Sequence, residues 1–308
     1  MKRVVSVSLG SSKRDKKVEH EFLGEQFTIE RIGTDGDKAK FRQMVADLDG
    51  KVDAIGMGGI DLYLVAGNRR YAFKDALKLA EPAKTTPVVD GSGLKNSLER
   101  ETIAYLQREK IIDFAGKNVM MVCAVDRFGM AEGLAKTPAK LLLGDLMYSL
   151  KVPIPIWSMG AIRVIAACLL PIITRLPFEM VYPTGEKQEH REPRYGKWYA
   201  WADIYAGDYH YINKYLPARI DGKIIITNTT TDEDVATYKE RGAHMLITST
   251  PEFDGRSFGT NVMEGVCIAL LGKRPAEMTS EDYMGVIRQL NWSPRVTVLN
   301  EPPSAKTG

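Results

Sequence analysis

Apolar and polar residues alternate in short stretches of the first third of the chain, which predicts strands with one buried face. Valines alternate with serines over residues 3–9, and residues 27–32 alternate in the same way. Apolar runs predict two more strands at 52–57 and 86–90. Apolar residues three or four positions apart predict helices at 40–48, 70–80 and 95–110. This alternation of strands and helices indicates a mainly parallel sheet.

A second series of strands and helices follows a joint near residues 114–118. Strands are predicted at 119–125, 154–157, 178–182, 202–206, 223–227 and 244–248, and helices at 131–150, 160–173, 208–216 and 232–241. Six strands with a helix in almost every gap are expected of a doubly wound nucleotide-binding domain. The gap after Tyr182 holds a charged stretch, 185–198, which we expect to be a surface lid.

The chain closes with an apolar helix predicted at 261–271 and an amphipathic helix that ends near Leu290. Thr279 and Asp282 open the second of these helices with the spacing of a capping box. Together, the elements predict an α/β protein of two domains, with mainly parallel sheets flanked by helices and a Rossmann-like second domain. We place a substrate-binding domain at 1–113, a nucleotide-binding domain at 114–272, and a C-terminal helix and tail at 273–308. A helix in that last position often packs back on the first domain.

Composition and charge narrow the class of protein. Of the 308 residues, 44% are hydrophobic and 26% charged, as in globular proteins. The net charge of +3 is too small to indicate a nucleic-acid partner, and the basic clusters are mixed with acids. We therefore expect the partner to be a small-molecule substrate. The sequence leaves the oligomeric state open, a homodimer included.

The sequence contains no visible export or membrane signal. The N-terminus leads directly into a predicted strand. The most apolar run, 160–173, contains an arginine and a proline and is shorter than the ~20 residues that span a bilayer, so it is predicted to be a buried helix. Cys123, Cys168 and Cys267 lie in apolar segments without a C-x-x-C motif. They are predicted to be reduced core thiols of a cytoplasmic protein.

Residues 118–133, N-V-M-M-V-C-A-V-D-R-F-G-M-A-E-G, have the order strand, tight turn and helix that opens a dinucleotide-binding domain. If Gly129 is the third glycine of G-x-G-x-x-G, Ala124 and Asp126 stand at the first two glycine positions. One interpretation is a modified phosphate site in which Arg127 supplies positive charge beside Asp126. The alternative is an ordinary turn in which Asp126 caps the helix.

The end of the predicted second strand bears on the choice of cofactor. NAD-binding domains usually place an acid there for the ribose 2′-hydroxyl, whereas a nearby arginine accommodates the 2′-phosphate of NADP. This strand ends in Trp157 and Ser158, with Arg163 a turn later and no acid. The expected nicotinamide cofactor is therefore NADP rather than NAD, with Ser158 and Arg163 as binding residues. Alternatively, Arg163 belongs to the polar face of a buried helix.

Two later strands are predicted to end in neutral hydrogen-bonding side chains. The run I-I-I-T-N-T-T-T-D places Asn228 and Thr229 after one strand, and Thr250 follows the next. Such groups suit a ribose, an amide or a carbonyl, and we assign them to cofactor binding. Thr231 and Asp234 fit a capping box, so part of this segment is structural.

Three loops of small polar residues are predicted to meet at the carboxyl edge of the first sheet, where open α/β folds bind ligands. The loop D-G-S-G-L-K at 90–95 has the features of an anion cradle, because its glycines admit the backbone and Lys95 adds charge at a helix start. Lys95 and Asp90 are candidate catalytic residues. The candidate substrate-binding residues of these loops and of the following helix are Ser11, Ser12, Gly59, Asp61, Ser92 and Arg100. The spacing excludes a G-x-x-x-x-G-K-[ST] nucleotide loop.

Histidines contribute one candidate. His210 follows a predicted strand and could act as a catalytic acid or base, although a histidine at a helix start is usually structural. None of the four histidines, His20, His190, His210 and His244, has metal-ligand spacing, so no metal is expected.

The layout of both halves, with A-D-I-Y-A-G at 202–207 and I-I-I-T-N-T-T-T at 224–231, resembles the quinate/shikimate 5-dehydrogenase family. The resemblance implies an N-terminal substrate domain and an NADP-binding Rossmann domain. It also implies a lysine–aspartate pair that moves a proton while hydride passes to or from C4 of the nicotinamide. The family's N-V-T-x-P-x-K segment is absent, and Lys95 after Gly93 stands nearest to it. Ser8, Ser11 and Ser12 are similar to the family's substrate-binding serines.

These observations predict an NADP-type oxidoreductase that acts on a small hydroxylated or carboxylated compound in a cleft between two domains. Two alternatives remain open. One is a transferase or lyase of the same fold without dinucleotide binding, and the other is a non-catalytic protein that binds a small anion.

Overall fold

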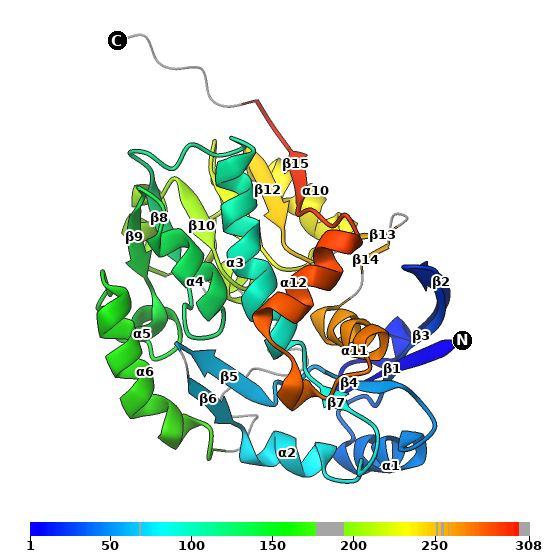
Figure 1. Cartoon of the computed structure of the whole chain (residues 1–308). Coiled ribbons are helices and arrows are strands. Elements are labelled where there is room, and N and C mark those ends of the chain that lie inside the picture. The colour runs from blue at the N-terminus through cyan, green and yellow to red at the C-terminus, as the bar shows by residue number, and fades with distance from the viewer. Residues whose placement is uncertain (68, 177–193, 251, 254–255, 258, 302–308) are drawn as a thin grey trace, which may run out of the picture. The chain divides into compact units, whose positions relative to one another are not determined.

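Contacts between residues divide the computed structural model into two compact units, which Figure 1 shows coloured along the chain. The structure describes residues 1–67, 69–176, 194–250, 252–253, 256–257 and 259–301. Unit 1 comprises the described residues of 1–97, 167–187 and 258–292, and unit 2 comprises those of 98–166, 188–257 and 293–308. Neither unit is a continuous stretch of chain, and the predicted boundary between residues 113 and 114 stays a prediction.

Unit 1 is built on a five-stranded sheet of β1 Lys2–Ser8, β2 Lys16–Phe22, β3 Glu25–Gly33, β4 Ala54–Gly58 and β7 Val88–Val89. The strand order is β2-β3-β1-β4-β7, and all pairs are parallel except β2 with β3. Val4, Val5 and Val7 of the central strand are fully buried, and burial of each side chain stabilises the fold by roughly 1.5–3 kcal/mol. The four predicted strands are confirmed. The edge strand β2 was not predicted, because most of its residues are polar.

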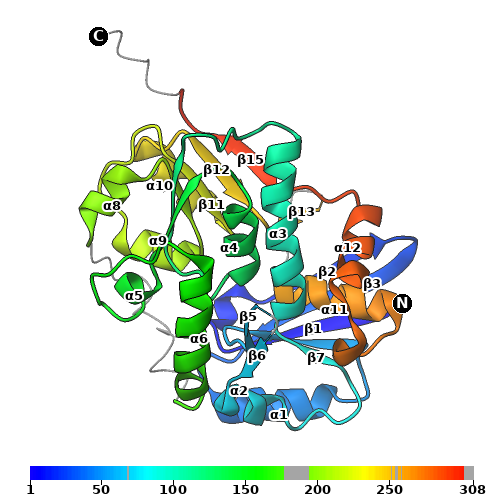
Figure 2. The same cartoon turned by 60° about the vertical axis from the view of Figure 1, so that its left-hand side comes forward.

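Helices cover both faces of this sheet. They are α1 Lys38–Leu48, α2 Lys74–Ala80, α11 Thr260–Leu271 and α12 Ser280–Gln289, with 3-10 turns at Ser12–Arg14 and Pro275–Glu277. α11 lies on one face, and α1 and α2 lie on the other (Figures 1 and 2). A Cβ at Gly265 of α11 would lie 2.8 Å from Val4 Cγ1, so glycine is what lets this helix approach β1 so closely. Thr279 and Asp282 form the predicted capping box of α12.

A hairpin of β5 Tyr63–Ala66 and β6 Arg69–Ala72 precedes α2. The helix predicted at 70–80 is therefore wrong in its first residues. The Arg70 guanidinium lies over the Tyr63 ring, with its carbon 3.6 Å from the ring centroid. Side-chain contacts between the two paired strands stabilise the hairpin. The spacing of apolar residues along a single segment cannot reveal such contacts.

Unit 2 is built on a six-stranded sheet of β8 Asn118–Met121, β9 Lys140–Leu143, β10 Ile204–Ala206, β11 Ile224–Thr227, β12 Met245–Thr248 and β15 Arg295–Val298. The order is β15-β12-β11-β10-β8-β9, with β15 antiparallel and the others parallel. Its helices are α4 Phe128–Ala135, α5 Asp145–Tyr148, α8 Gly196–Trp201, α9 Tyr209–Tyr215 and α10 Asp232–Glu240. Figure 2 shows α8, α9 and α10 on one side of the sheet and α4 on the other. The predicted α/β class with a Rossmann-like second part is confirmed.

The second strand of this sheet is not where the sequence pattern put it. The helix predicted at 131–150 is wrong, because α4 ends at Ala135 and β9 and α5 follow. Pro138 prevents a continuous helix, and a short apolar run such as Leu141–Leu143 has no helical periodicity of its own. The strand predicted at 154–157 is also wrong, since Ile156 makes only one isolated bridge, to Leu143.

Other predicted segments fall partly outside the described residues. The strand at 178–182 and most of the lid at 185–198 lie outside them, as does His190. The described end of the lid segment enters α8 at Gly196. Two short strands, β13 Glu252–Phe253 and β14 Arg256–Ser257, pair antiparallel.

Tyrosines fill much of the unit 2 core between the sheet and α8–α10. Tyr148, Tyr199, Tyr205 and Tyr215 are each at most 2% exposed. Each of their hydroxyl groups has a partner: Tyr205 donates to the Tyr199 carbonyl at 2.8 Å, and Tyr215 to the Tyr148 carbonyl at 3.0 Å. Tyr199 donates to the Ile212 carbonyl, and Tyr148 contacts the Met120 sulfur. The core is therefore apolar in bulk, and the hydroxyls of these four tyrosines are satisfied.

Two helices carry the chain from one unit to the other, α3 Ser92–Arg108 and α6 Met159–Ile173. α6 is not the buried helix that its composition predicted. Ile162, Ala166 and Leu170 form one buried stripe, whereas Val164 is 65% exposed and Cys168 is exposed. The prediction of a core thiol is therefore wrong for Cys168, while Cys123 and Cys267 are buried. Among the described residues, no helix has both the length and the apolarity that a membrane span requires.

Candidate functional site

The strand order of the unit 2 sheet reverses between β8 and β10. The chain moves from β8 to β9 on one side, and from β10 to β11 and β12 on the other. In open α/β sheets, ligands bind at the carboxyl ends of the strands at such a switch point. Polar side chains from the turn after β8, the turn after β10 and the end of β11 meet at this place.

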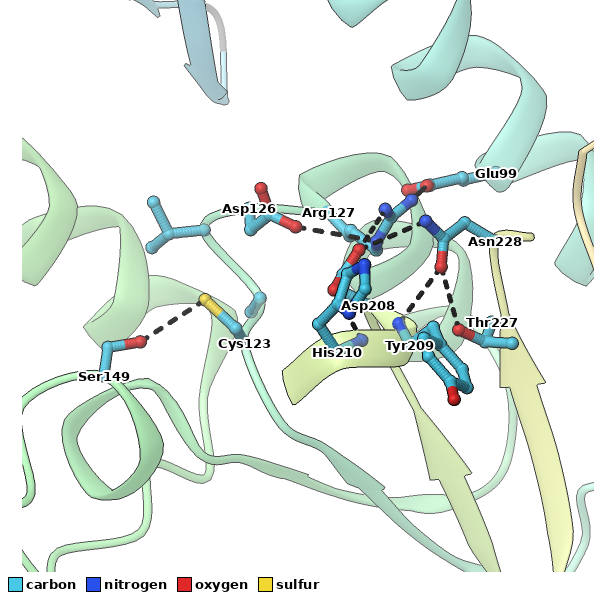
Figure 3. A network of polar contacts seen from close by, with 12 residues as sticks. Glu99, Cys123, Asp126, Arg127, Ser149, Asp208, Tyr209, His210, Thr227 and Asn228 are labelled. Carbon is cyan, nitrogen blue, oxygen red and sulfur yellow. Dashed lines mark hydrogen bonds and ion pairs between the residues drawn. The ribbon is translucent and has the colours of Figure 1, made fainter. Parts of the chain in front are cut away.

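Arg127, in the turn between β8 and α4, is the centre of this group (Figure 3). Its Nη1 donates to Glu99 Oε1 of α3, its Nη2 lies 2.7 Å from Asp208 Oδ2, and its Nε lies 3.5 Å from Asp126 Oδ2. Burial alone lowers the pKa of Arg127, but the carboxylates of Glu99, Asp208 and Asp126 outweigh burial and raise that pKa above its usual value. Arg127 therefore stays charged, and three carboxylates share its charge.

Asp208 connects Arg127 to the ends of β10 and β11. Its Oδ1 accepts the His210 N–H at 2.8 Å and caps α9, while its Oδ2 accepts from Asn228 Nδ2 at 3.1 Å. Asn228 Oδ1 accepts in turn from the Tyr209 N–H and the Thr227 hydroxyl, both at 3.0 Å. These bonds fix the orientation of the Asn228 amide. We call Glu99, Asp126, Arg127, Asp208 and Asn228 the Arg127 network.

Asp145 holds the turn that precedes Arg127. Its Oδ2 accepts the Ala124 N–H at 3.0 Å and its Oδ1 accepts the Val125 N–H at 2.9 Å. The side chain is 6% exposed, and Asp145 stands two residues after the end of β9. Burial raises the pKa of this carboxyl, and the two N–H bonds oppose that shift.

Cys123, in the same turn, is not a nucleophile at neutral pH. Its sulfur lies 3.6 Å from Asp145 Oδ1 and 3.6 Å from the Ser149 hydroxyl (Figure 3). Burial raises the pKa of the thiol well above its ordinary value, and the charges of Asp145 and Asp126 raise it further. The thiol therefore stays protonated, whereas nucleophilic cysteines react as thiolates.

The proposed NADP residues Ser158 and Arg163 lie at the start of α6. The Ser158 hydroxyl accepts the N–H groups of Gly160 and Ala161, so it caps the helix. Arg163 and Arg100 both pair with Glu132 of α4, at 2.9 and 2.8 Å. The second strand is β9, and the residues that follow it are Gly144 and an acid, Asp145. The sequence favoured NADP over NAD because no acid followed the predicted second strand. That reason is wrong, because an acid follows β9.

The strand ends carry the neutral groups that the sequence indicated. Thr229 is exposed, Thr250 is 3% exposed, and their hydroxyl oxygens lie 2.6 Å apart. Thr231 and Asp234 form the predicted capping box of α10. His210 is exposed at the start of α9, and Gly129 is buried within α4.

The loops of unit 1 are tied down by their own hydrogen bonds. The Ser8 hydroxyl accepts from Arg31 Nη2 at 3.1 Å, and the Ser11 carbonyl accepts from Arg31 Nη1 at 3.0 Å. The Ser12 N–H donates to Asp35. Gly59 has a φ of +70°, which glycine adopts without strain, and Asp61 follows it in the turn to β5.

Asp90 and Ser92 lie in the turn from β7 to α3. Asp90 Oδ2 accepts the N–H groups of Leu62 and Tyr63 at 2.6 and 2.9 Å, and its Oδ1 accepts that of Ser92 at 3.0 Å. Lys95 follows in the first turn of α3, and its N–H donates to the Gly91 carbonyl. The Asp90 carboxylate thus organises backbone in unit 1.

A buried acid that the sequence did not point to lies against the same turn. Glu264 of α11 is 2% exposed, and its Oε1 accepts from the Tyr283 hydroxyl at 2.7 Å. A Cβ at Gly93 would lie 2.4 Å from that oxygen. Burial raises the pKa of Glu264 to about 7, and the Asp90 charge adds to the shift, while the Tyr283 and Gly91 hydrogen bonds and Arg70 oppose it.

Sequence reasoning missed four acids that shape these places: Glu99, Asp145, Asp208 and Glu264. A lone glutamate in the apolar run of 262–271 was the one visible signal, because such a residue must be buried with the helix. The other three meet their partners only in the folded chain. Among the described residues, no three His, Cys, Asp or Glu side chains are grouped so as to hold a metal ion.

Fold and site define a two-unit α/β protein with a Rossmann-like second unit and a polar network at its switch point. A family model described as "Domain of unknown function (DUF8754)" matches residues 93–299, more than half of the chain, so the chain belongs to this family. A second, "Domain of unknown function (DUF8753)", matches residues 3–90. No curated protein matches the chain.

Several solved structures are similar to the chain at low identity. A putative malic enzyme (malate oxidoreductase) is 14% identical with a TM-score of 0.36, and the alignment covers 94% of this chain and 84% of that one. The NAD-dependent malic enzyme of Thermotoga maritima is 12% identical with a TM-score of 0.38 and the same coverage. A sugar ABC transport substrate-binding protein of Bordetella parapertussis is 10% identical, with a TM-score of 0.37, over 99% and 92% of the chains. Likenesses this distant do not decide a function.

Proposed function

We propose that the chain binds an uncharged, hydroxylated small molecule at the switch point of the unit 2 sheet. The observation that carries the proposal is the convergence of Arg127, Asp208 and Asn228, from three separate segments, at the point where the strand order reverses. Open α/β sheets place their ligands there.

The groups that would hold a phosphate at this point are already engaged. Arg127 shares its charge with three carboxylates, so little of its attraction is left for another anion. The N–H groups of Ala124 and Val125 donate to Asp145. A ligand with hydroxyl groups does not need either of these contacts.

The strand ends offer groups that suit such a ligand. Thr229 and His210 are exposed, and each follows a strand that ends at the switch-point edge. A hydroxyl and an imidazole can both donate to and accept from an alcohol. The Arg127 network serves as a rigid base that holds the ends of β10 and β11 in place.

Calorimetric titration of the full chain tests the proposal. D-ribose and adenosine are the uncharged probes, and NADH and NADPH are the phosphate-bearing ones. We expect an uncharged probe to bind, and Thr229→Val to weaken its binding about threefold to tenfold through loss of one hydrogen bond. Thr297→Val, at a part-buried threonine of β15, is the matched control. Binding of NADH or NADPH alone, or of no probe, would contradict the proposal.

A second candidate function is an NADP-type oxidoreductase acting on a small hydroxylated or carboxylated compound, as the resemblance to quinate/shikimate 5-dehydrogenases implies. The strand order β9-β8-β10-β11-β12 favours a nucleotide cofactor, because doubly wound sheets of the order 2-1-3-4-5 bind such cofactors at their switch point. In this candidate, Lys95 of unit 1 handles the proton. Quinate with NADP or NAD is the assay, read as absorbance of the reduced nicotinamide. Turnover that Lys95→Met abolishes would support it, and no turnover with either cofactor would remove it.

A further inference from the structure

The turn between β8 and α4 already holds an anion, and that anion is a side chain of the protein. The successive N–H groups of Ala124 and Val125 point at the two oxygens of one carboxylate, Asp145, at 3.0 and 2.9 Å. Consecutive backbone N–H groups that face one acceptor form an anion-binding nest. In dinucleotide-binding units, the turn after the first strand presents such groups to the pyrophosphate.

The backbone places Asp145 at this nest without freedom to move away. β9 lies beside β8 in parallel register, and the Gly144 N–H donates to the Met121 carbonyl at 2.7 Å. A Cβ at position 144 would lie 2.4 Å from Tyr148 Cδ2, so glycine is required there. The pairing of β9 with β8 thus places the Asp145 carboxylate against the turn, where it is buried.

Charge at the nest is consistent with one anion and not with two. Asp126 and Arg127 follow the nest directly in the chain. The carboxylates of Asp126 and Asp208 both pair with Arg127. The fold tolerates one further negative charge there, that of Asp145. A phosphate added beside it would meet carboxylates and no unengaged N–H of Ala124 or Val125.

We infer that Asp145 is a resident anion that takes the place of a ligand phosphate at the first turn of unit 2 and so excludes phosphate-bearing ligands from it. The inference deepens the proposed function and rests on it for the location of the ligand. It assigns Asp145 as a residue that determines specificity without contacting the ligand.

Chemical rescue tests this assignment without any ligand of the proposed site. Asp145→Gly removes the carboxylate and leaves both N–H groups without their acceptor, so we expect a lower melting temperature. Formate or inorganic phosphate should then restore at least half of the lost melting temperature, relative to sodium chloride at equal ionic strength. The wild-type chain should not respond.

Met147→Ala is the matched control, because Met147 is fully buried in the same short helix, α5. It should also lower the melting temperature, yet no anion should restore it. An Asp145→Gly chain that unfolds cooperatively but responds to anions no more than Met147→Ala would overturn the inference.

A measurement on the wild-type chain covers the case in which Asp145→Gly does not fold. The amide NMR signals of Ala124 and Val125 should stay unchanged when inorganic pyrophosphate is titrated in. A saturable shift of both signals would overturn the inference. Loss of the proposed function, shown by absent ribose or adenosine binding, would leave both anion experiments unaffected, so the two failures are distinguishable.

Discussion

Asp145 of unit 2 and Glu264 of unit 1 are both buried against a turn at the end of a parallel strand, and they differ in the hydrogen bonds that they receive. In unit 2, both oxygens of Asp145 accept backbone N–H groups. In unit 1, Glu264 has Tyr283 at Oε1, whereas its Oε2 is buried without a hydrogen-bond partner among the described residues. The nearby Ser92 hydroxyl is also buried without one.

The comparison shows that burial alone does not fix the role of an acid. Asp145 is held by paired donors and acts as part of the backbone framework. Glu264, with one oxygen lacking a hydrogen-bond partner among the described residues and with the Asp90 carboxylate nearby, has a pKa raised by burial to about 7. Glu264 therefore gains or loses its proton near neutral pH, and unit 1 carries the pH-sensitive acid.

The largest expected loss of stability comes from a substitution in the Arg127 network of unit 2. Arg127→Met removes the guanidinium from Glu99, Asp126 and Asp208, and removing one partner of a buried ion pair costs about 3–5 kcal/mol. We expect the free energy of unfolding, measured with urea, to fall by about that amount. Arg219→Met, which breaks an exposed pair with Asp221, should leave the free energy of unfolding almost unchanged, because solvent screens exposed pairs. Equal losses in the two variants would refute the view that the Arg127 network is a stabilising centre.

The next effect tests the raised pKa of Glu264. The unfolded-state pKa of Glu264 is near its ordinary 4.5, and the folded-state pKa is about 7. Below the lower value both states are protonated and nothing is lost. Between the two values the unfolded state ionises first, so the free energy of unfolding falls as pH rises, by about 2–4 kcal/mol in all, and then stays level.

Glu264→Gln keeps the shape and cannot ionise, so its unfolding free energy should not show this fall. The measurement is urea unfolding of both chains across the range from about pH 4.5 to about pH 7. The difference between the chains isolates Glu264 from acids such as Asp282, whose pKa is lowered to about 2 by Lys273 and the Thr279 cap. Parallel profiles for wild type and variant would show that Glu264 does not titrate here.

The smallest effect probes how closely unit 1 packs around its acid. Gly93→Ala places a methyl group 2.4 Å from Glu264 Oε1 and 2.6 Å from the Tyr283 hydroxyl, which should cost about 1–3 kcal/mol. Gly285→Ala in α12, where no atom lies within 4 Å of the added carbon, should instead stabilise by roughly 0.5–1 kcal/mol. Thermal unfolding distinguishes the two signs. A stable Gly93→Ala chain would mean that the Glu264–Tyr283 pair can move aside.

The sequence predicted those elements that can be recognised from the residues of their own segment. Strands with regular alternation or a bounded apolar run, such as β1 and β11, were found, and so were the capping boxes at Thr231 and Thr279. The strand β9 was missed because a run of three leucines is too short to show the period of a strand or of a helix. The sequence could therefore place Arg127 and Asp126 in a turn but not the acid beside it.

The candidate site depends on contacts between distant segments. Arg127 meets Glu99 and Asp208, which are 28 and 81 residues away in the chain. Asp145 reaches the turn only because β9 pairs with β8. Asn228 and Thr229 were recognised from the strand end alone, whereas no pattern indicated that Asp208 would hold Asn228.

The packing of α11 on β1 and β4 affects the order in which the parts of unit 1 can fold during synthesis. Gly265 packs on Val4 and Ala54, so this face of the first sheet stays uncovered until α11, about 200 residues further along the chain, has been made. At a typical synthesis rate, the ribosome needs roughly 10–40 s to pass from Ala54 to Gly265. During that interval the face of the sheet that carries Val4 and Ala54 lacks the helix that covers it in the folded unit. Unit 1 therefore reaches its final form only after α11 has been synthesised.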